Sequence, residues 1–298
     1  MRITQNMTSA TALYNLQKGQ AKLNKLEEQL ASSSNINRPS DDPVNTSFLL
    51  SIGDQLKAGT QYASNITKAT TFLNVTSTAL QGMSDTLSQA TTLVDTITSG
   101  SSDATVRQST VSQLQSLKQS LIDYGNTQSG DQYVFGGGVT TAPFSSSSST
   151  YSGDETALKV EIGKSTSQQM NLTGNQVLKG SGTSTPYGTT DILTAFDNLI
   201  TAVQNNDVTG IVSGAQAIQD GSTQITNAQS DVASRLIRLQ NSTTMNTTSQ
   251  NTLETIAGNI QNVDTAKLGV ELTNQQTAYQ ASLSATAKVM NMSLLDYM

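Results

Sequence analysis

The stretch SSSNINRPSDDPVNTS, residues 32–47, contains two of the four prolines in this 298-residue chain. It separates two segments whose apolar residues have helical spacing. Pro39 disfavours helix at the residue before it and so ends the first segment. Ser40 is a good N-cap, the two aspartates after it suit the positive end of a helix dipole, and Pro43 is tolerated in a first turn. The stretch therefore predicts the end of one helix and the start of the next.

Before this stretch, apolar or small residues recur at alternating spacings of four and three. They are Ala12, Leu16, Gly19, Leu23, Leu26 and Leu30. This is the 3.5-residue period of a coiled coil. A stripe this short and narrow does not hold an isolated helix in water. The first helix therefore needs a partner helix.

Helical spacing also covers most of the remaining chain. We expect helices at about 43–98, 104–124, 190–204 and 208–240, and again in the terminal segment. There Leu268, Leu272, Tyr279 and Leu283 share one side, with Ile256, Ile260, Val263 and Val270 along a neighbouring side. This pattern predicts a bundle of long helices built from both chain ends.

The middle of the chain has a different texture. Residues 133–188 contain YVFGGG, five serines at 145–149 and TALKVEIG, which indicate short strands joined by Ser/Gly loops. The expected fold is mainly α, with an inserted β-rich domain. The expected domains are terminal coiled-coil helices (1–40 and 258–298), a helical bundle (41–132 and 189–257) and an outer β-rich domain (133–188).

The composition argues against most catalytic chemistry. The chain has no cysteine and no histidine, which removes thiolate sites, the commonest general base and the commonest transition-metal ligand. VEIGKST (160–166) resembles the end of a phosphate-binding loop, but Leu158 stands where that motif needs glycine. Asp41 and Asp42 fit a helix start better than a metal site. We expect no enzyme, no cofactor and no metal.

Charge and hydropathy also limit the partners. The net charge is −6, which argues against nucleic acid or an anionic membrane as partner. Residues 1–40 carry five basic and two acidic residues, and residues 250–298 carry two basic and four acidic ones, so the ends could attract each other weakly. No secretory signal or membrane span is visible. Any export would therefore have to use a route without such a signal.

Three separate segments carry a resemblance to a known family. NRPSDDPV (37–44) after the leucine heptad, GDQYVFGG (130–137) and NVDTAKLGVELTNQQTAYQASLSATAKVMNMSLLDYM (262–298) resemble segments of the flagellin superfamily. Flagellins proper usually have alanines where Pro39 and Pro43 stand. The proline form is similar to that of the hook-associated proteins at the hook–filament junction. AKLGV (266–270) and Gln261 depart from the acidic pattern that the family usually shows there.

The resemblance implies a structural role in the bacterial flagellum, outside the cell. The protein would join the hook-side junction protein to the flagellin filament, as a ring of its own copies. The implied partners also include a cytoplasmic export chaperone, and the terminal helices would be disordered in the monomer. The assembly residues would be Leu16, Leu23, Leu26, Leu30, Leu268, Leu272, Tyr279 and Leu283. The linker between layers would be Asn37, Arg38, Pro39, Ser40, Asp41, Asp42 and Pro43.

Three alternatives stay open. The pattern alone fits an ordinary bundle, in which the chain ends pair within one monomer, as well as it fits pairing on assembly. The chain could instead be a divergent flagellin that forms the filament. From a different class, it could be a secreted adhesin or binding module whose β-rich domain recognises a ligand, although the aromatic residues of 133–188 are scattered.

Overall fold

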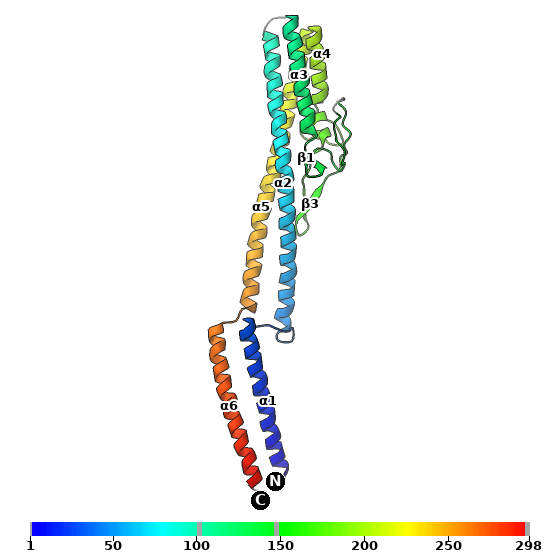
Figure 1. Cartoon of the computed structure of the whole chain (residues 1–298). Helices are drawn as coiled ribbons and strands as arrows, with labels where there is room; N and C mark the ends of the chain where they lie inside the picture. Colours follow the sequence, from blue (N-terminus) through cyan, green and yellow to red (C-terminus); the bar gives the residue numbers. More distant parts are fainter. Residues whose placement is uncertain (1, 100–102, 146–148, 296–298) are drawn as a thin grey trace. The chain divides into compact units, whose positions relative to one another are not determined.

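A computed structural model describes residues 2–99, 103–145 and 149–295 of the chain (Figure 1). Its helices are α1 (Arg2–Ser32), α2 (Pro43–Ser99), α3 (Ala104–Gly125), α4 (Ile192–Asn205), α5 (Val208–Gln261) and α6 (Thr265–Leu295), with a π-helical turn η1 (Asn175–Lys179). Its strands are β1 (Gln128–Ser129), β2 (Gln132–Tyr133), β3 (Lys159–Gly163) and β4 (Thr166–Gln169). The predicted fold class, mainly α with a β-rich insertion, is confirmed.

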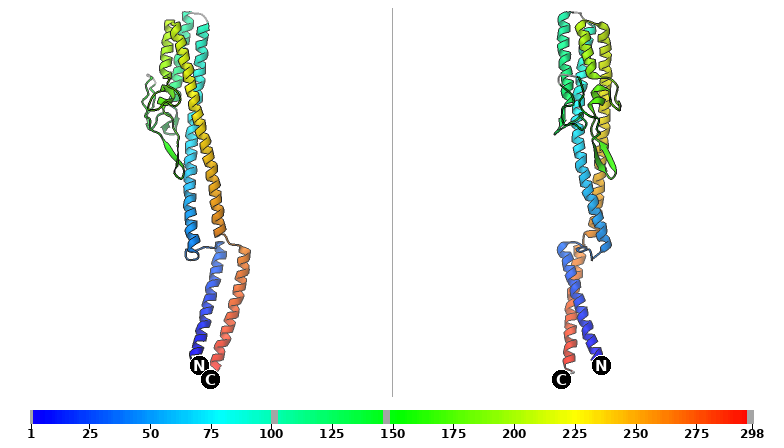
Figure 2. Two further views of the ribbon diagram at one scale, coloured as in Figure 1. Left: turned by 180° about the vertical axis from the view of Figure 1, so that it is seen from behind. Right: turned by 90° about the vertical axis from the view of Figure 1, so that its right-hand side faces the viewer.

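The chain divides into two compact units. The terminal unit contains Met1–Lys57 and Ser249–Met298, and the central unit contains Ala58–Thr248. In the terminal unit, α1 and α6 lie side by side and run in opposite directions (Figures 1 and 2). None of the helices in the described part of the chain combines the length and the hydropathy of a membrane span.

The core of the central unit rests on two apolar stripes with a spacing of seven residues. On α2 the stripe is Leu73, Leu80, Leu87 and Val94, and on α5 it is Ile211, Ile218, Ile225, Val232 and Leu239. All nine side chains are buried, and each such burial stabilises the fold by about 1.5–3 kcal/mol. A strict seven-residue period keeps one side of a long helix against its neighbours.

The helix predicted to end near residue 240 continues to Gln261. The last member of the α5 stripe is Leu239, so the apolar period stops where the helix was expected to stop. The helix itself continues through the largely polar segment after it. Ile256 and Ile260 therefore lie on α5, before the break at 262–264, and not on the terminal helix.

The β-rich insertion consists of two hairpins (Figure 1). In the first, β1 pairs with β2 around Gly130, whose φ of 63° suits glycine. In the second, β3 pairs with β4 around a turn in which Ser165 has a φ of 59°. The strand after Gly163 excludes the phosphate-binding alternative for VEIGKST, because that motif requires a helix at this point.

A polar face of α5 fastens the insertion to the helices. It consists of Gln224, Asn227, Asp231, Arg235 and Arg238, which follow one another at spacings of three or four. The Arg235 Nη1 donates to the backbone oxygens of Gln169 (3.2 Å) and Asn171 (3.0 Å). The Tyr187 hydroxyl donates to Asp231 Oδ2 (2.6 Å), and burial raises the pKa of Tyr187.

The most buried member of this polar face is Gln224. Its Nε2 donates to the backbone oxygens of Val177 (2.9 Å) and Thr190 (3.0 Å), and its Oε1 accepts from the Thr190 N–H (3.0 Å). One amide therefore satisfies three backbone groups, one in the insertion and two at Thr190, where the chain returns to α4. Buried backbone groups without such partners are costly, so this contact specifies where the insertion lies on α5.

Gln224→Leu is expected to destabilise the central unit by about 2–4 kcal/mol, because it removes the partners of three backbone groups at once. The measurement is equilibrium unfolding in urea. Gln219→Leu, on the exposed side of the same helix, is the matched control and is expected to change the free energy of unfolding by less than about 0.5 kcal/mol. Equal effects of the two substitutions would contradict the role of Gln224.

Candidate assembly interface

The candidate site is the pair of terminal helices together with the linker that follows α1. The two helices approach closely at Gly19, where an added Cβ atom would lie 3.3 Å from Cδ2 of Tyr279. The Gln275 Nε2 donates to the backbone oxygen of Gly19 (3.3 Å). The small residue at this position of the heptad therefore lets the Tyr279 ring lie against the α1 backbone.

Among the described side chains, one ion pair joins the two helices. The Lys22 Nζ lies 3.3 Å from Glu271 Oε1, and both side chains are about half exposed. Such a pair contributes at most about 1 kcal/mol. The weak attraction predicted between the basic and acidic chain ends thus corresponds to this contact, and it does not by itself hold the helices together.

The eight predicted assembly residues differ widely in burial. Leu26 and Leu268 are buried, with 5% and 7% of their surface exposed. Leu16, Leu23, Leu272 and Tyr279 are partly buried. Leu30 and Leu283 are exposed, at 36% and 51%. The structure therefore brings some of these residues together at the linker end of the pair and leaves part of each apolar stripe uncovered.

The linker folds back on α1 through Asp41. The Oδ2 of Asp41 accepts from the backbone N–H groups of Asn37 (3.3 Å) and Arg38 (3.0 Å), and its Oδ1 lies 2.9 Å from Lys25 Nζ. The Arg38 Nη2 lies 3.2 Å from Glu28 Oε2. The hydrogen bond from Lys25, and those from the linker backbone, lower the pKa of Asp41 below 3.8. Asp41 therefore ties the linker to α1.

The N-cap of α2 is Asp42, and not Ser40 as predicted. Its Oδ1 accepts from the Asn45 N–H (3.0 Å) and its Oδ2 from the Asn45 Nδ2 (2.7 Å). These bonds lower the pKa of Asp42. Pro43 then stands at the first helical position, where the missing N–H costs no helical bond. The second proline therefore starts α2.

A second connection joins the linker after α1 to the short segment between α5 and α6, and the sequence analysis did not predict it. Ser34 and Asn262 form an antiparallel β-bridge, and the Asn35 N–H donates to the backbone oxygen of Gln261 (2.7 Å). Asp264 then caps α6 by accepting from the N–H groups of Ala266 (3.1 Å) and Lys267 (3.0 Å). The N-cap of α6 had a sequence signal, an aspartate before a helix. The bridge had none, because it joins distant residues.

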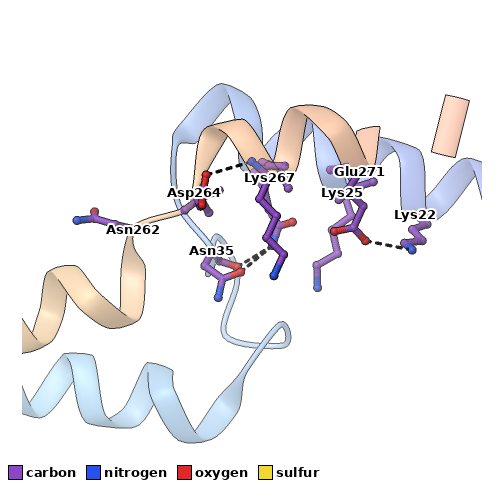
Figure 3. Close-up of a pocket in the computed structure, with 11 residues that line it drawn as sticks. Lys22, Lys25, Asn35, Asn262, Asp264, Lys267 and Glu271 are labelled. Carbon is purple, nitrogen blue, oxygen red and sulfur yellow. Dashed lines mark hydrogen bonds and ion pairs between the residues drawn. The ribbon is translucent and has the colours of Figure 1, made fainter. Parts of the chain in front are cut away.

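Two adjoining grooves run between α1 and α6, with volumes of about 390 and 580 Å³. Figure 3 shows the first, with Lys22 and Lys25 of α1 and Lys267 of α6 along it. The grooves combine lysines, two acidic residues (Asp264 and Glu271) and apolar side chains such as Leu26, Leu268 and Tyr279. This chemistry suits a protein surface with a carboxylate and apolar side chains. Over the described residues, no three carboxylates gather as a metal site.

Two family models match this chain, and together they cover most of it. The N-terminal helical region of bacterial flagellin matches residues 3–140, and the C-terminal helical region matches residues 215–298. The chain belongs to the flagellin family. Among curated proteins of this family, it is 24% identical over 212 residues to flagellar hook-associated protein 3 of Escherichia coli K12. That alignment takes in 68% of this chain and 67% of the relative.

Solved structures share the fold of this flagellin-family chain. A Vibrio parahaemolyticus protein, described as flagellar hook-associated, aligns with a TM-score of 0.67 at 23% identity, over 74% of this chain and all of its own. The flagellar junction protein FlgL of Legionella pneumophila aligns with a TM-score of 0.59 at 16% identity, over 72% of this chain and 99% of its own. These similarities establish the fold.

The carboxyl group of Asp41 is expected to titrate with a midpoint below 3.8, because Lys25 and the linker N–H groups stabilise its charged form. Since this pKa is lowered on folding, the linker contact is fully stabilising above the unfolded pKa, near 4, and is lost as the pH falls through the folded pKa. Carboxyl ¹³C chemical shifts of the assembled protein, in which α1 is ordered, measured against pH, test this expectation.

Lys25→Ala should move the Asp41 midpoint upward, because Lys25 is the largest cause of the shift. Lys57→Ala removes a lysine of the terminal unit whose partner is Asp54, and is the matched control. An Asp41 midpoint that is unchanged by Lys25→Ala would contradict the fold-back of the linker.

Proposed function

We propose that this chain is a structural component of the bacterial flagellum that joins the hook-side junction protein to the flagellin filament. Membership of the flagellin family supports the flagellar part of this proposal. The names of its relatives, hook-associated protein 3 and the junction protein FlgL, support the adaptor part. The proline-containing linker NRPSDDPV, where flagellins proper usually have alanines, supports the same choice.

The observation that carries this proposal is the uncovered apolar surface of the terminal unit. Only Leu26, Ile52 and Leu268 among its described apolar residues are buried. Among the side chains that the structure describes, nine large apolar ones of this unit are exposed, namely Met7, Leu13, Tyr14, Leu30, Val44, Phe48, Leu50, Val270 and Leu283. Apolar surface of this kind marks a protein–protein interaction site. A protein that assembles through its chain ends requires such a surface.

In this proposal the parts of the chain have separate roles. Segments 1–40 and 258–298 form an inner coiled-coil layer, segments 41–132 and 189–257 form a helical layer, and residues 133–188 face outward. The eight assembly residues named above contact other copies in a ring. The partners are the first junction protein on one side, flagellin on the other, and a cytoplasmic chaperone before export.

The terminal helices are proposed to order only on assembly. A thin apolar stripe buries too little surface to offset the entropy of ordering a helix in the monomer. Ordering then takes place on binding, which lowers the risk of premature polymerisation. The protein is proposed to act outside the cell, without catalysis, and to reach the flagellum without a cleaved signal.

Deletion of the gene in the source bacterium tests this function. The expected result is hooks without filaments, with abundant monomeric flagellin in the culture medium. Flagellin export continues, but the hook lacks the protein to which the filament attaches. Electron microscopy of the cell surface and an immunoblot of the medium provide the readouts, and the wild-type gene on a plasmid is the control. Hooks without filaments and no flagellin in the medium would mean that this chain is itself the filament subunit. Normal filaments would refute both the adaptor role and the filament-subunit role, and would favour an adhesin.

Pro43→Ala is expected to leave the helicity of the purified chain nearly unchanged but to reduce the number of filaments per cell. Alanine is a good helix former, whereas it does not fix φ at the start of α2 as proline does. Circular dichroism and filament counts provide the two measurements. Pro186→Ala, in an exposed part of the insertion, is the matched control. Normal motility and filament number in the Pro43 variant would contradict a role for this proline in assembly.

A further inference from the structure

The heptad of α1 has one covered side and one open side. Leu16, Leu23 and Leu30 occupy its a positions, and Gly19 and Leu26 its d positions. Helix α6 covers the d side, where Leu26 is buried and Tyr279 lies over Gly19. The a side stays open, because Leu30 is 36% exposed and Leu16 and Leu23 are only partly buried.

The open side continues at the e positions, which hold Leu13 and Glu27. Leu13 is 57% exposed, and the Glu27 carboxylate has no ion-pair partner among the described residues. We call this surface the leucine edge and define it as Leu13, Leu16, Leu23, Leu30 and Glu27. It is an apolar strip with one negative charge near its linker end.

The other side of the helix pair carries what we call the lysine groove. It is defined by Lys18, Lys22 and Lys25 of α1 and Lys267 of α6, which line the two adjoining grooves. The base of the larger groove includes Gly19, Ala278 and Tyr279. The Tyr279 ring, which lies over Gly19, and Ala278 supply its apolar surface. The groove is therefore partly apolar and partly charged, with the acidic Asp264 and Glu271 beside the four lysines.

Two of the four lysines are free to bind a further carboxylate. Lys22 is paired with Glu271 and Lys25 with Asp41, whereas the ammonium groups of Lys18 and Lys267 have no ion-pair partner among the described residues. Four of the chain's 16 basic residues line this groove, although the whole chain has a net charge of −6. Asp264 and Glu271 also line the groove, so four lysines and two acids leave a net charge of +2, which favours a carboxylate from outside.

We propose that the leucine edge of one copy docks into the lysine groove of a second copy. The two surfaces are complementary in charge, because the Glu27 carboxylate of one faces the Lys267 ammonium group of the other, both unpaired among the described residues, and both surfaces also carry apolar side chains. Glu271 pairs with Lys22, so Lys267 lies one helical turn nearer the linkers, at about the level of Leu26 and Glu27. When two copies stand at the same level along the axis of the helix pair, Glu27 of one copy therefore meets Lys267 of the next.

The two surfaces lie on opposite flanks of the α1 seam, since Glu27 occupies an e position and Lys22 a g position. Docking one into the other is consequently a head-to-tail contact, which generates a closed ring or a helical array. A symmetric pairing of two leucine edges would place Glu27 against Glu27, which is unfavourable. This inference rests on the proposed function, because it names the surfaces through which the copies in the ring meet.

Site-specific crosslinking tests the contact directly, because the natural chain has no cysteine. The variant carries Glu27→Cys and Lys267→Cys, is expressed in the deletion strain, and is treated with a short bismaleimide on sheared flagellar appendages. A ladder of covalent oligomers on a denaturing gel is expected, because each copy contributes one residue to each neighbour. Each single-cysteine variant should stay monomeric, since a head-to-tail contact never brings two copies of one residue together.

The outcomes separate this inference from the proposed function. If the double-cysteine chain is present in appendages that carry filaments and forms no ladder, the docking inference is wrong and the adaptor role stands. Dimers from either single-cysteine variant would also overturn it, because they require a symmetric contact. If the wild-type chain is absent from the appendages, the proposed function itself fails.

Charge reversal gives a second, independent measurement. Glu27→Lys places a lysine against Lys267 and should lower the number of filaments per cell roughly three- to tenfold, because like charges at an interface are repelled. Adding Lys267→Glu to it should restore at least half of the wild-type number. Glu254→Lys makes the same charge change in the terminal unit outside both surfaces and should have no effect. No loss with Glu27→Lys, or no rescue by the second reversal, would overturn the inference.

Discussion

The main constraint on the terminal unit is that α6 alone can cover only part of the apolar heptad residues of α1. An α-helix contacts one neighbour along a narrow strip, and α6 uses that strip to bury Leu26 and to lie against Gly19. The a-position leucines are covered only in part, since Leu16 and Leu23 are partly buried and Leu30 is 36% exposed. Their exposure is a direct consequence of helix geometry, and it leaves the single chain with an apolar surface that a second protein surface must cover.

Contacts within the linkers fix the end of α1 against the starts of α2 and α6. Asp41 binds the backbone of residues 37 and 38 and pairs with Lys25 of α1, while Asp42 caps α2. The β-bridge between Ser34 and Asn262 joins the segment after α1 to the segment between α5 and α6. Each aspartate thus has a separate role, although the two are adjacent. The prolines act on the backbone, by ending one helix and starting another.

The central unit uses a different balance of interactions. Two seven-residue stripes bury its core, and the polar face of α5 orients the β-rich insertion through groups such as Gln224 and Arg235. Apolar burial supplies most of the stability there, and hydrogen bonds to specific backbone oxygens supply the position. The terminal unit has no comparable core among its described residues, which is consistent with chain ends that require partners.

The sequence by itself determined most of the helices, the second hairpin and the heptad of α1, because these depend on local spacing and on Pro, Gly and Asp at helix ends, whereas the first hairpin begins at Gln128, before the predicted range of 133–188. It misplaced the end of α5, since a polar helix after Leu239 carries no apolar period, and it chose Ser40 over Asp42 as the cap because both residue types suit that role. Only the tertiary structure decided which leucines α6 covers, where Ser34 meets Asn262 and which lysines stay unpaired. Those facts depend on contacts between residues far apart in the chain, and no local pattern encodes them.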